Sequence, residues 1–172
     1  MNQKRTYLLL VVFCCFSIVY TLCIQSQKQV ELYTLNSNIT WNTNYNKSLF
    51  QRKMEGLFSE DIIVFYYEEA KKENLDPYFL VACTLFEYYG APRQITPLTP
   101  NGLFSKETQM EIIHSIATEF SQTTPSYRYY GRTTLQEVGQ SLSPATIPDH
   151  SLDTAKNLLQ YMNDLKTRDQ LF

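Results

Sequence analysis

The expected architecture of this chain depends on residues 74–87, which read NLDPYFLVACTLFE. Asp76 is a favourable N-cap and Pro77 a favourable first helical residue, so the pattern predicts a helix that begins at Pro77. Gly90 tolerates the left-handed backbone that ends many helices, which predicts a helix end near Tyr89. Because almost every position between these signals is apolar, we expect this helix to lie in the core.

Glu87 is the only charged side chain in this predicted helix. It shares a helical face with Leu80, Cys83 and Thr84, so we expect its carboxyl group beside apolar surface. Burial disfavours a carboxylate, and so does the negative C-terminal end of the helix dipole. A carboxyl group that keeps its proton near neutral pH can act as a general acid. The alternative, from these residues alone, is an exposed helix-end glutamate without a chemical role.

Four more helices are predicted after the first 56 residues, from apolar residues at helical spacing and from capping signals. Their expected starting points are Ser59, Ser105, Thr134 and the stretch 149–151. The sequence Thr134-Leu-Gln-Glu137 has the form of a capping box. Nothing indicates a strand, so the sequence predicts a mainly α domain of about five helices with irregular loops.

The N-terminus carries an uncharged, largely apolar run at residues 7–24, preceded by Lys4 and Arg5. A bilayer needs roughly 18 to 20 such residues, whereas the apolar region of a signal peptide is usually shorter, about 7 to 15. Leu22 before Cys23 also makes a poor lipoprotein-type cleavage junction. We therefore favour an uncleaved, single-pass anchor in residues 1–25 over a secretory signal peptide. The positive side tends to stay cytoplasmic, which predicts an extracytoplasmic C-terminal domain.

Two further segments are expected after the anchor. Residues 26–56 are rich in Asn, Thr, Gln and Ser and show little apolar periodicity. We therefore interpret them as a polar stalk, and place the folded domain at residues 57–172.

Charge and cysteine usage exclude several classes of function. The chain has 15 basic and 17 acidic residues, and two of the basic residues belong to the anchor. This balance argues against a nucleic-acid-binding protein, which normally carries a basic patch. Three of the four cysteines, Cys14, Cys15 and Cys23, lie in the anchor, which leaves Cys83 without a disulfide partner. With two histidines and no cofactor motif, we expect neither a metal site nor a cofactor.

A loop rich in tyrosine supplies the second candidate element, at Tyr127, Tyr129 and Tyr130. Aromatic rings stack on sugar faces, and a tyrosine hydroxyl can form a hydrogen bond with a reacting sugar. The alternative is that these rings pack the loop onto the core.

A second carboxylate is less easily assigned. Glycosidases usually pair two, but the next acid after Glu87 is Glu107, which suits the first turn of a helix. A mechanism with one acid is therefore simpler, in which the substrate's own 2-acetamido or 6-hydroxyl group is the nucleophile. Glu111 and Glu119 are further candidates.

Residues 74–87 resemble the catalytic helix of lysozyme-like cell-wall hydrolases, namely lytic transglycosylases and bacterial endo-β-N-acetylglucosaminidases. In those families a Gly or Asn, a hydrophobic residue, an Asp or Asn and a Pro lead into an apolar helix that ends in the catalytic Glu. The C-terminal part of the chain is similar to that of the glucosaminidases. The similarity consists of residues 134–139, followed by Ser143-Pro144 and a final amphipathic helix. The resemblance covers residues 59–165.

This resemblance implies a lysozyme-like fold and cleavage of the β-1,4 bond in the glycan strands of peptidoglycan. It implies Glu87 as the general acid and Tyr129 or Tyr130 as the site tyrosine. The implied substrate-binding residues are Tyr88, Asn101, Phe104 and Tyr127.

The chain departs from the pattern of these families in two places. They commonly follow the Glu with Ser or Thr and then Gly, where this chain has Tyr88-Tyr89-Gly90. Their Asn-Pro/Leu-Phe/Tyr-Gly segment appears only as Asn101-Gly102-Leu103-Phe104. These departures favour one alternative, a glycan-binding or scaffolding module that anchors a wall-spanning assembly without cutting. A third possibility is a purely structural, membrane-anchored helical bundle, which requires Glu87 to be exposed to solvent with no cleft beside it. No protein partner is predicted.

Overall fold

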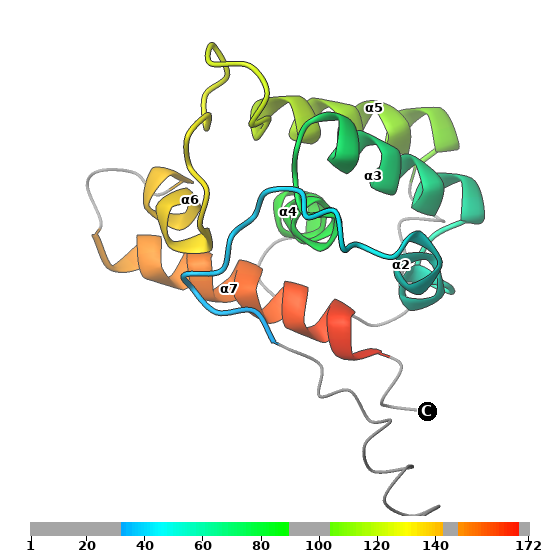
Figure 1. Cartoon of the computed structure of the whole chain (residues 1–172), viewed down its shortest axis with the longest axis horizontal. Coiled ribbons are helices and arrows are strands. Elements are labelled where there is room, and N and C mark those ends of the chain that lie inside the picture. The colour runs from blue at the N-terminus through cyan, green and yellow to red at the C-terminus, as the bar shows by residue number, and fades with distance from the viewer. Residues whose placement is uncertain (1–31, 90–103, 143–147, 169–172) are drawn as a thin grey trace, which may run out of the picture. The chain divides into compact units, whose positions relative to one another are not determined.

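The computed structural model describes residues 32–89, 104–142 and 148–168, without the side chains of residues 88, 89 and 148–152. This part of the chain is mainly helical, and its β-structure consists of isolated bridges (Figure 1). The prediction of a mainly α domain is therefore confirmed. The predicted anchor at residues 1–25 lies outside the described residues. None of the helices described here combines the length and the apolar character that crossing a membrane requires.

Six helices are described. They are α2 (Lys47–Met54), α3 (Glu60–Lys72), α4 (Pro77–Tyr89), α5 (Lys106–Glu119), α6 (Leu135–Leu142) and α7 (Pro148–Thr167). The five helices predicted from the sequence are all present, as α3 to α7. Helix α2 was not predicted, and α7 begins slightly earlier than the sequence indicated.

The predicted helix caps at Asp76 and Thr134 form as expected. One carboxylate oxygen of Asp76 accepts hydrogen bonds from two backbone N–H groups in the first turn of α4, at 2.8 and 3.2 Å. The capping box also forms, because the backbone N–H of Glu137 donates to Thr134 Oγ1 at 3.3 Å and that of Thr134 donates to Glu137 Oε2 at 3.0 Å. Ser59 occupies the N-cap position of α3, but its side chain makes no capping hydrogen bond.

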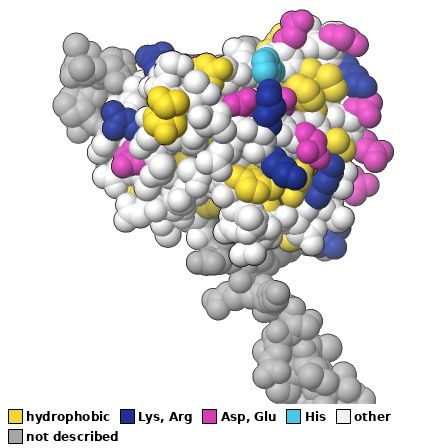
Figure 2. Space-filling view, turned by 45° about the horizontal axis from the view of Figure 1, so that its top comes forward, with side chains coloured by type: hydrophobic (Ala, Val, Ile, Leu, Met, Phe, Trp, Pro, Cys, Tyr) yellow, Lys and Arg dark blue, Asp and Glu magenta, His cyan; other side chains and the backbone are white. Residues whose placement is uncertain are grey.

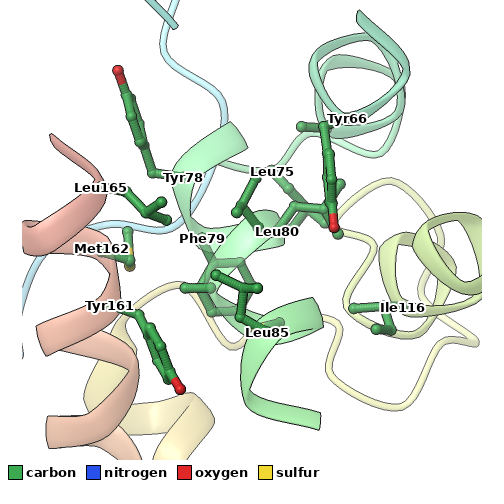
Figure 3. Close-up of a cluster of buried hydrophobic side chains, with 14 of the residues drawn as sticks. Tyr66, Leu75, Tyr78, Phe79, Leu80, Leu85, Ile116, Tyr161, Met162 and Leu165 are labelled. Atoms are coloured by element: carbon green, nitrogen blue, oxygen red, sulfur yellow. The ribbon is translucent and has the colours of Figure 1, made fainter. Parts of the chain in front are cut away.

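Helix α4 is the centre of the domain and packs against α3, α5 and α7. In Figure 1 it is seen end-on, whereas α3, α5 and α7 run across the view, so α4 passes crosswise between them. Residues 79–82 of α4 are completely buried, as their apolar sequence predicts. Figure 3 shows the side chains around α4: Tyr161, Met162 and Leu165 from α7, Tyr66 from α3 and Ile116 from α5.

Helices α3 and α5 run parallel to each other and begin at the same end of the domain. Asp61 near the start of α3 pairs with Lys106 at the start of α5, and Glu69 pairs with His114 at 2.8 Å, two turns further along both helices. The C-terminal ends of α3 and α5 therefore lie side by side. This arrangement brings Glu119, the last residue of α5, to the same end of the domain at which α3 ends.

The predicted polar stalk is wrong for residues 32–56, because these residues belong to the folded domain. Tyr33 and Ile39 are buried, and α2 buries Phe50 and Met54. The stretch is polar on average, yet four of its apolar side chains enter the core, whereas Leu32 and Leu49 stay exposed. Backbone hydrogen bonds hold it as well, since the N–H of Ile39 donates to the loop before α6 at 2.9 Å.

Candidate functional site

Glu87 lies in the last turn of α4, on a face that runs from the core to the surface. Phe79 and Cys83 precede it at intervals of four residues, so the three side chains share one side of the helix. Phe79 and Cys83 are buried, and the Cys83 thiol is free, whereas the Glu87 side chain is exposed. The expectation of a dry setting for Glu87 is therefore wrong, because α4 leaves the core in its last turn.

The pKa of Glu87 is nevertheless raised above the ordinary value of a glutamate. The largest cause is the desolvation of its carboxyl group by neighbouring protein atoms, and the second is the negative charge of Glu119; Arg128 acts in the opposite direction. Exposure of the residue and partial desolvation of its carboxyl group are compatible, because protein atoms on one side displace water without covering the side chain. The predicted direction of the pKa shift is confirmed, with a second carboxylate as an additional cause.

Glu119 is held at the end of α5 by contacts on both sides. Its Oε1 lies 3.4 Å from Nη1 of Arg128, and about a third of its side chain is exposed. The next residue, Phe120, is buried and packs edge-on against Phe79 of α4, with 5.4 Å between the ring centres. The end of α5 is thus fastened to the first turn of α4, about two helical turns before Glu87.

The three predicted tyrosines have different surroundings. Tyr129 is 2% exposed and stacks on Phe120, with ring centres 4.5 Å apart. Burial raises the pKa of Tyr129, and its ring packs the loop onto the core, which is the alternative considered from the sequence. Tyr127 and Tyr130 are exposed by 37% and 44%, and their rings are accessible to a ligand.

Sequence reasoning missed Arg128 and Gln122, which organise this loop. The Arg128 guanidinium lies 5.1 Å from the centre of the Tyr129 ring while it pairs with Glu119. Gln122 donates from Nε2 to the Tyr129 carbonyl at 3.0 Å and accepts from the Gly131 N–H at 2.9 Å. The isolated arginine among the tyrosines was a signal for an ion pair, but its partner could not be known from the sequence.

The other predicted residues are not gathered around Glu87 by the described structure. Phe104 is 38% exposed and precedes α5 at the opposite end from Glu119. The rise of 1.5 Å per residue separates these ends of the helix by about 20 Å. The Tyr88 side chain and Asn101 lie outside the described residues.

A surface pocket of about 550 Å³ lies between α2 and α3. Its position is at the N-terminal end of α3, away from Glu119, so it is not part of the surroundings of Glu87. Its lining residues are Gln51, Arg52, Glu55, Phe58, Glu60 and Ile63.

On the face shown in Figure 2, acidic and basic side chains are intermixed and hydrophobic side chains form small separate patches. Among the described residues, no cluster of His, Cys, Asp or Glu has the composition of a metal site.

The candidate site therefore consists of an exposed carboxyl group with a raised pKa and a second carboxylate, paired with an arginine, that contributes to this shift. The loop that carries the arginine also exposes two tyrosine rings. Comparison of the chain with protein-family models, curated proteins and solved structures finds no significant match. What the site can do chemically follows from these residues themselves.

Proposed function

We propose that this chain cleaves a β-1,4 glycosidic bond in the glycan strands of peptidoglycan, with Glu87 as the general acid. The observation that supports this proposal is the raised pKa of a carboxyl group at the surface end of a buried helix. A general acid needs both properties, since it must hold a proton and reach the oxygen of the leaving group. The choice of substrate rests on the resemblance of residues 74–87 and 134–139 to wall hydrolases. The lysozyme-like fold is part of the same proposal.

In the proposed reaction, the Glu87 carboxyl group gives its proton to the glycosidic oxygen while the bond from that oxygen to the sugar C1 breaks. Positive charge then develops on the sugar ring. Water or the substrate's own 6-hydroxyl group then bonds to C1 and gives its proton back to the Glu87 carboxylate. Alternatively, the 2-acetamido oxygen bonds to C1 first, and water, which returns its proton to Glu87, opens the ring so formed. Tyr127 and Tyr130 offer exposed ring faces on which neighbouring sugars of the strand stack.

The proposed setting is the cell-wall side of a membrane. Residues 7–24 form the single-pass anchor, and the helical domain works outside on the glycan strands. In this setting the partner is peptidoglycan rather than nucleic acid, and the reaction uses no cofactor.

The test is mass spectrometry of glycan fragments after purified peptidoglycan is incubated with the full chain in mild detergent. New reducing ends would indicate hydrolysis, and anhydro-sugar ends would indicate transglycosylation. We expect Glu87→Gln to slow fragment release by about 100-fold or more, which is the usual contribution of a general acid. Glu60→Gln is the matched control, because Glu60 is an exposed acid in the first turn of α3, at the end of that helix away from Glu119. A Glu87→Gln protein that cleaves at the wild-type rate would exclude Glu87 as the acid.

A second candidate function is glycan binding without cleavage. It is favoured by the exposure of Glu87, because glycosidases commonly enclose their acid more fully. In that case the wild-type chain would sediment with glycan strands and release neither reducing ends nor anhydro-sugars. The same incubation thus separates the two functions.

A further inference from the structure

We infer that the loop between α5 and α6, residues 121–134, binds glycan strands that still carry their peptide stems. Tyr127 and Tyr130 stack on sugar rings, and Arg132 pairs with a carboxylate group of a stem. The identity of this ligand rests on the proposed function. The inference requires no contact between the loop and Glu87, because a strand longer than the domain can engage both.

The first step is that the loop is held in a defined conformation. Gln122 donates from Nε2 to the Tyr129 carbonyl at 3.0 Å and accepts from the Gly131 N–H at 2.9 Å. The backbone N–H of Gln122 donates to the carbonyl of Glu73, the residue after α3, at 3.0 Å. The buried Tyr129 ring, stacked on Phe120, also fastens the loop to the core. A loop that is already ordered loses little conformational entropy when it binds a ligand.

The second step is that this conformation brings two exposed tyrosines close together. The N–H of Tyr130 donates to the Tyr127 carbonyl at 3.1 Å. Such a bond closes a β-turn, in which the first and fourth α-carbons lie within about 7 Å of each other. Both side chains are exposed, and Figure 1 shows the loop projecting beyond the adjoining ends of α5 and α6. The loop therefore presents a small aromatic surface that is accessible to a ligand.

The third step concerns charge. The loop carries Arg128 and Arg132 and no acidic residue, although acidic residues outnumber basic ones in the whole chain. Arg128 pairs with Glu119, whereas Arg132 is exposed and its side chain forms no hydrogen bond or ion pair within the described part of the chain. The Arg132 N–H donates to the Tyr129 carbonyl at 3.0 Å, so a second β-turn keeps Arg132 next to the tyrosines. The loop is thus complementary to a ligand that carries negative charge.

The class of ligand follows from these residue types. A guanidinium group matches a carboxylate through two parallel hydrogen bonds, and tyrosine rings stack on the faces of sugars. One arginine without an internal partner is too little for a polyanion such as nucleic acid, which needs a cation for each phosphate that it contacts. Peptidoglycan strands offer both features, because their sugars carry short peptides whose carboxyl groups are ionised at neutral pH.

The test is isothermal titration calorimetry with soluble glycan strands purified from peptidoglycan, either with their stems or after an amidase has removed them. The protein is the full chain in mild detergent, with Glu87→Gln in every variant so that no strand is cut during the measurement. We expect this parent chain to bind strands with stems about 3- to 10-fold more tightly than strands without stems. Arg132→Gln should abolish this preference by weakening the binding of strands with stems alone.

Two further variants separate the roles of charge and stacking. Joint replacement of Tyr127 and Tyr130 by alanine should weaken the binding of both kinds of strand by about 10-fold, because both kinds contain the sugars. Lys106→Gln is the matched control for Arg132→Gln. It removes the same charge from the opposite end of α5, where Lys106 forms an exposed pair with Asp61, and it should leave both affinities unchanged. Circular dichroism checks that each variant is folded.

Equal affinities of the parent chain for the two kinds of strand would overturn the inference. So would an equal loss of affinity in Arg132→Gln and Lys106→Gln, which would show that only the total charge of the protein matters.

Cleavage, measured separately on chains that retain Glu87, distinguishes this inference from the proposed function. A chain that recognises stems through Arg132 and never cuts a strand would contradict the proposed cleavage alone. A chain that cuts strands but binds them equally well with and without stems would contradict the inference alone.

Discussion

The phenolic O–H of Tyr33 donates a hydrogen bond of 2.8 Å to Oδ2 of Asp76, across 43 positions of the chain. Tyr45 donates to the same oxygen, while Oδ1 caps the first turn of α4. Asp76 is completely buried, and burial raises its pKa although the four hydrogen bonds favour the charged form. The residue that begins the central helix therefore also fastens the N-terminal segment to the core.

Replacement of Asp76 should be among the most destabilising single changes in the domain. Asp76→Ala removes the helix cap and leaves the buried Tyr33 hydroxyl without its acceptor. We expect the free energy of unfolding to fall by about 3 kcal/mol or more, measured by urea denaturation. Tyr45→Phe, which removes one of the four hydrogen bonds, should cost only about 1 kcal/mol. If Asp76→Ala were no more harmful than Tyr45→Phe, the junction would not have the structural role described here.

Truncation should locate the boundary of the domain at residue 32. A chain that begins at residue 32 keeps Tyr33, Ile39 and α2 and should unfold cooperatively on heating, followed by near-ultraviolet circular dichroism. A chain that begins at residue 57 loses four buried side chains from the core and should show no cooperative transition. Equal melting curves for the two chains would restore the interpretation of this segment as a stalk.

Glu87→Gln should stabilise the fold at neutral pH even as it removes the proposed acid. The pKa of Glu87 is higher in the folded than in the unfolded chain. The contribution of this group to stability is therefore fully present at pH values below its pKa in the unfolded chain, and it is lost as the pH rises through its pKa in the folded chain. At pH 7 the charged side chain therefore costs stability, which the neutral amide avoids. Because Glu87 is exposed, we expect a rise in Tm of only about 1 to 3 °C.

Calorimetry at two pH values distinguishes this effect from other consequences of the substitution. At pH 3, where Glu87 is protonated, wild type and Glu87→Gln should melt at the same temperature. A difference in Tm that is equal at pH 3 and pH 7 would show that charge is not its cause.

The capping box before α6 should show the opposite pH dependence. Backbone N–H groups of Thr133 and Thr134 hold the pKa of Glu137 below its usual range. A carboxyl group whose pKa is lowered by folding stabilises the fold at pH values above its pKa in the unfolded chain. This stabilisation is lost as the pH falls through its pKa in the folded chain. The destabilisation caused by Glu137→Ala should therefore be largest at pH 7 and shrink towards pH 3 in thermal melts.

Thr134→Ala is the matched control for this prediction, because the Thr134 hydroxyl caps the backbone N–H of Glu137 without titrating. It should cost about 1 kcal/mol, and that cost should persist at low pH. Parallel pH profiles for Thr134→Ala and Glu137→Ala would contradict an ionic contribution from Glu137.

The sequence by itself determined the helices α3 to α7, the caps at Asp76 and Thr134, and the burial of α4. These features arise from interactions within a few residues, since capping bonds and apolar periodicity act inside one or two helical turns. Helix α2 and the segment before it escaped prediction for the same reason. Their place in the core depends on contacts such as that between Tyr33 and Asp76, which no local pattern records.

Only the tertiary structure decided the surroundings of Glu87. The sequence placed this glutamate at the end of an apolar helix, but whether that end is buried depends on how far α4 extends beyond its neighbours. The pairing of Glu119 with Arg128 depends on the stacking of Phe120 on Tyr129, which joins the end of α5 to the loop that carries Arg128. Electrostatic interaction depends on distance in space, so charged groups far apart in the chain influence one another only when the core brings their elements together.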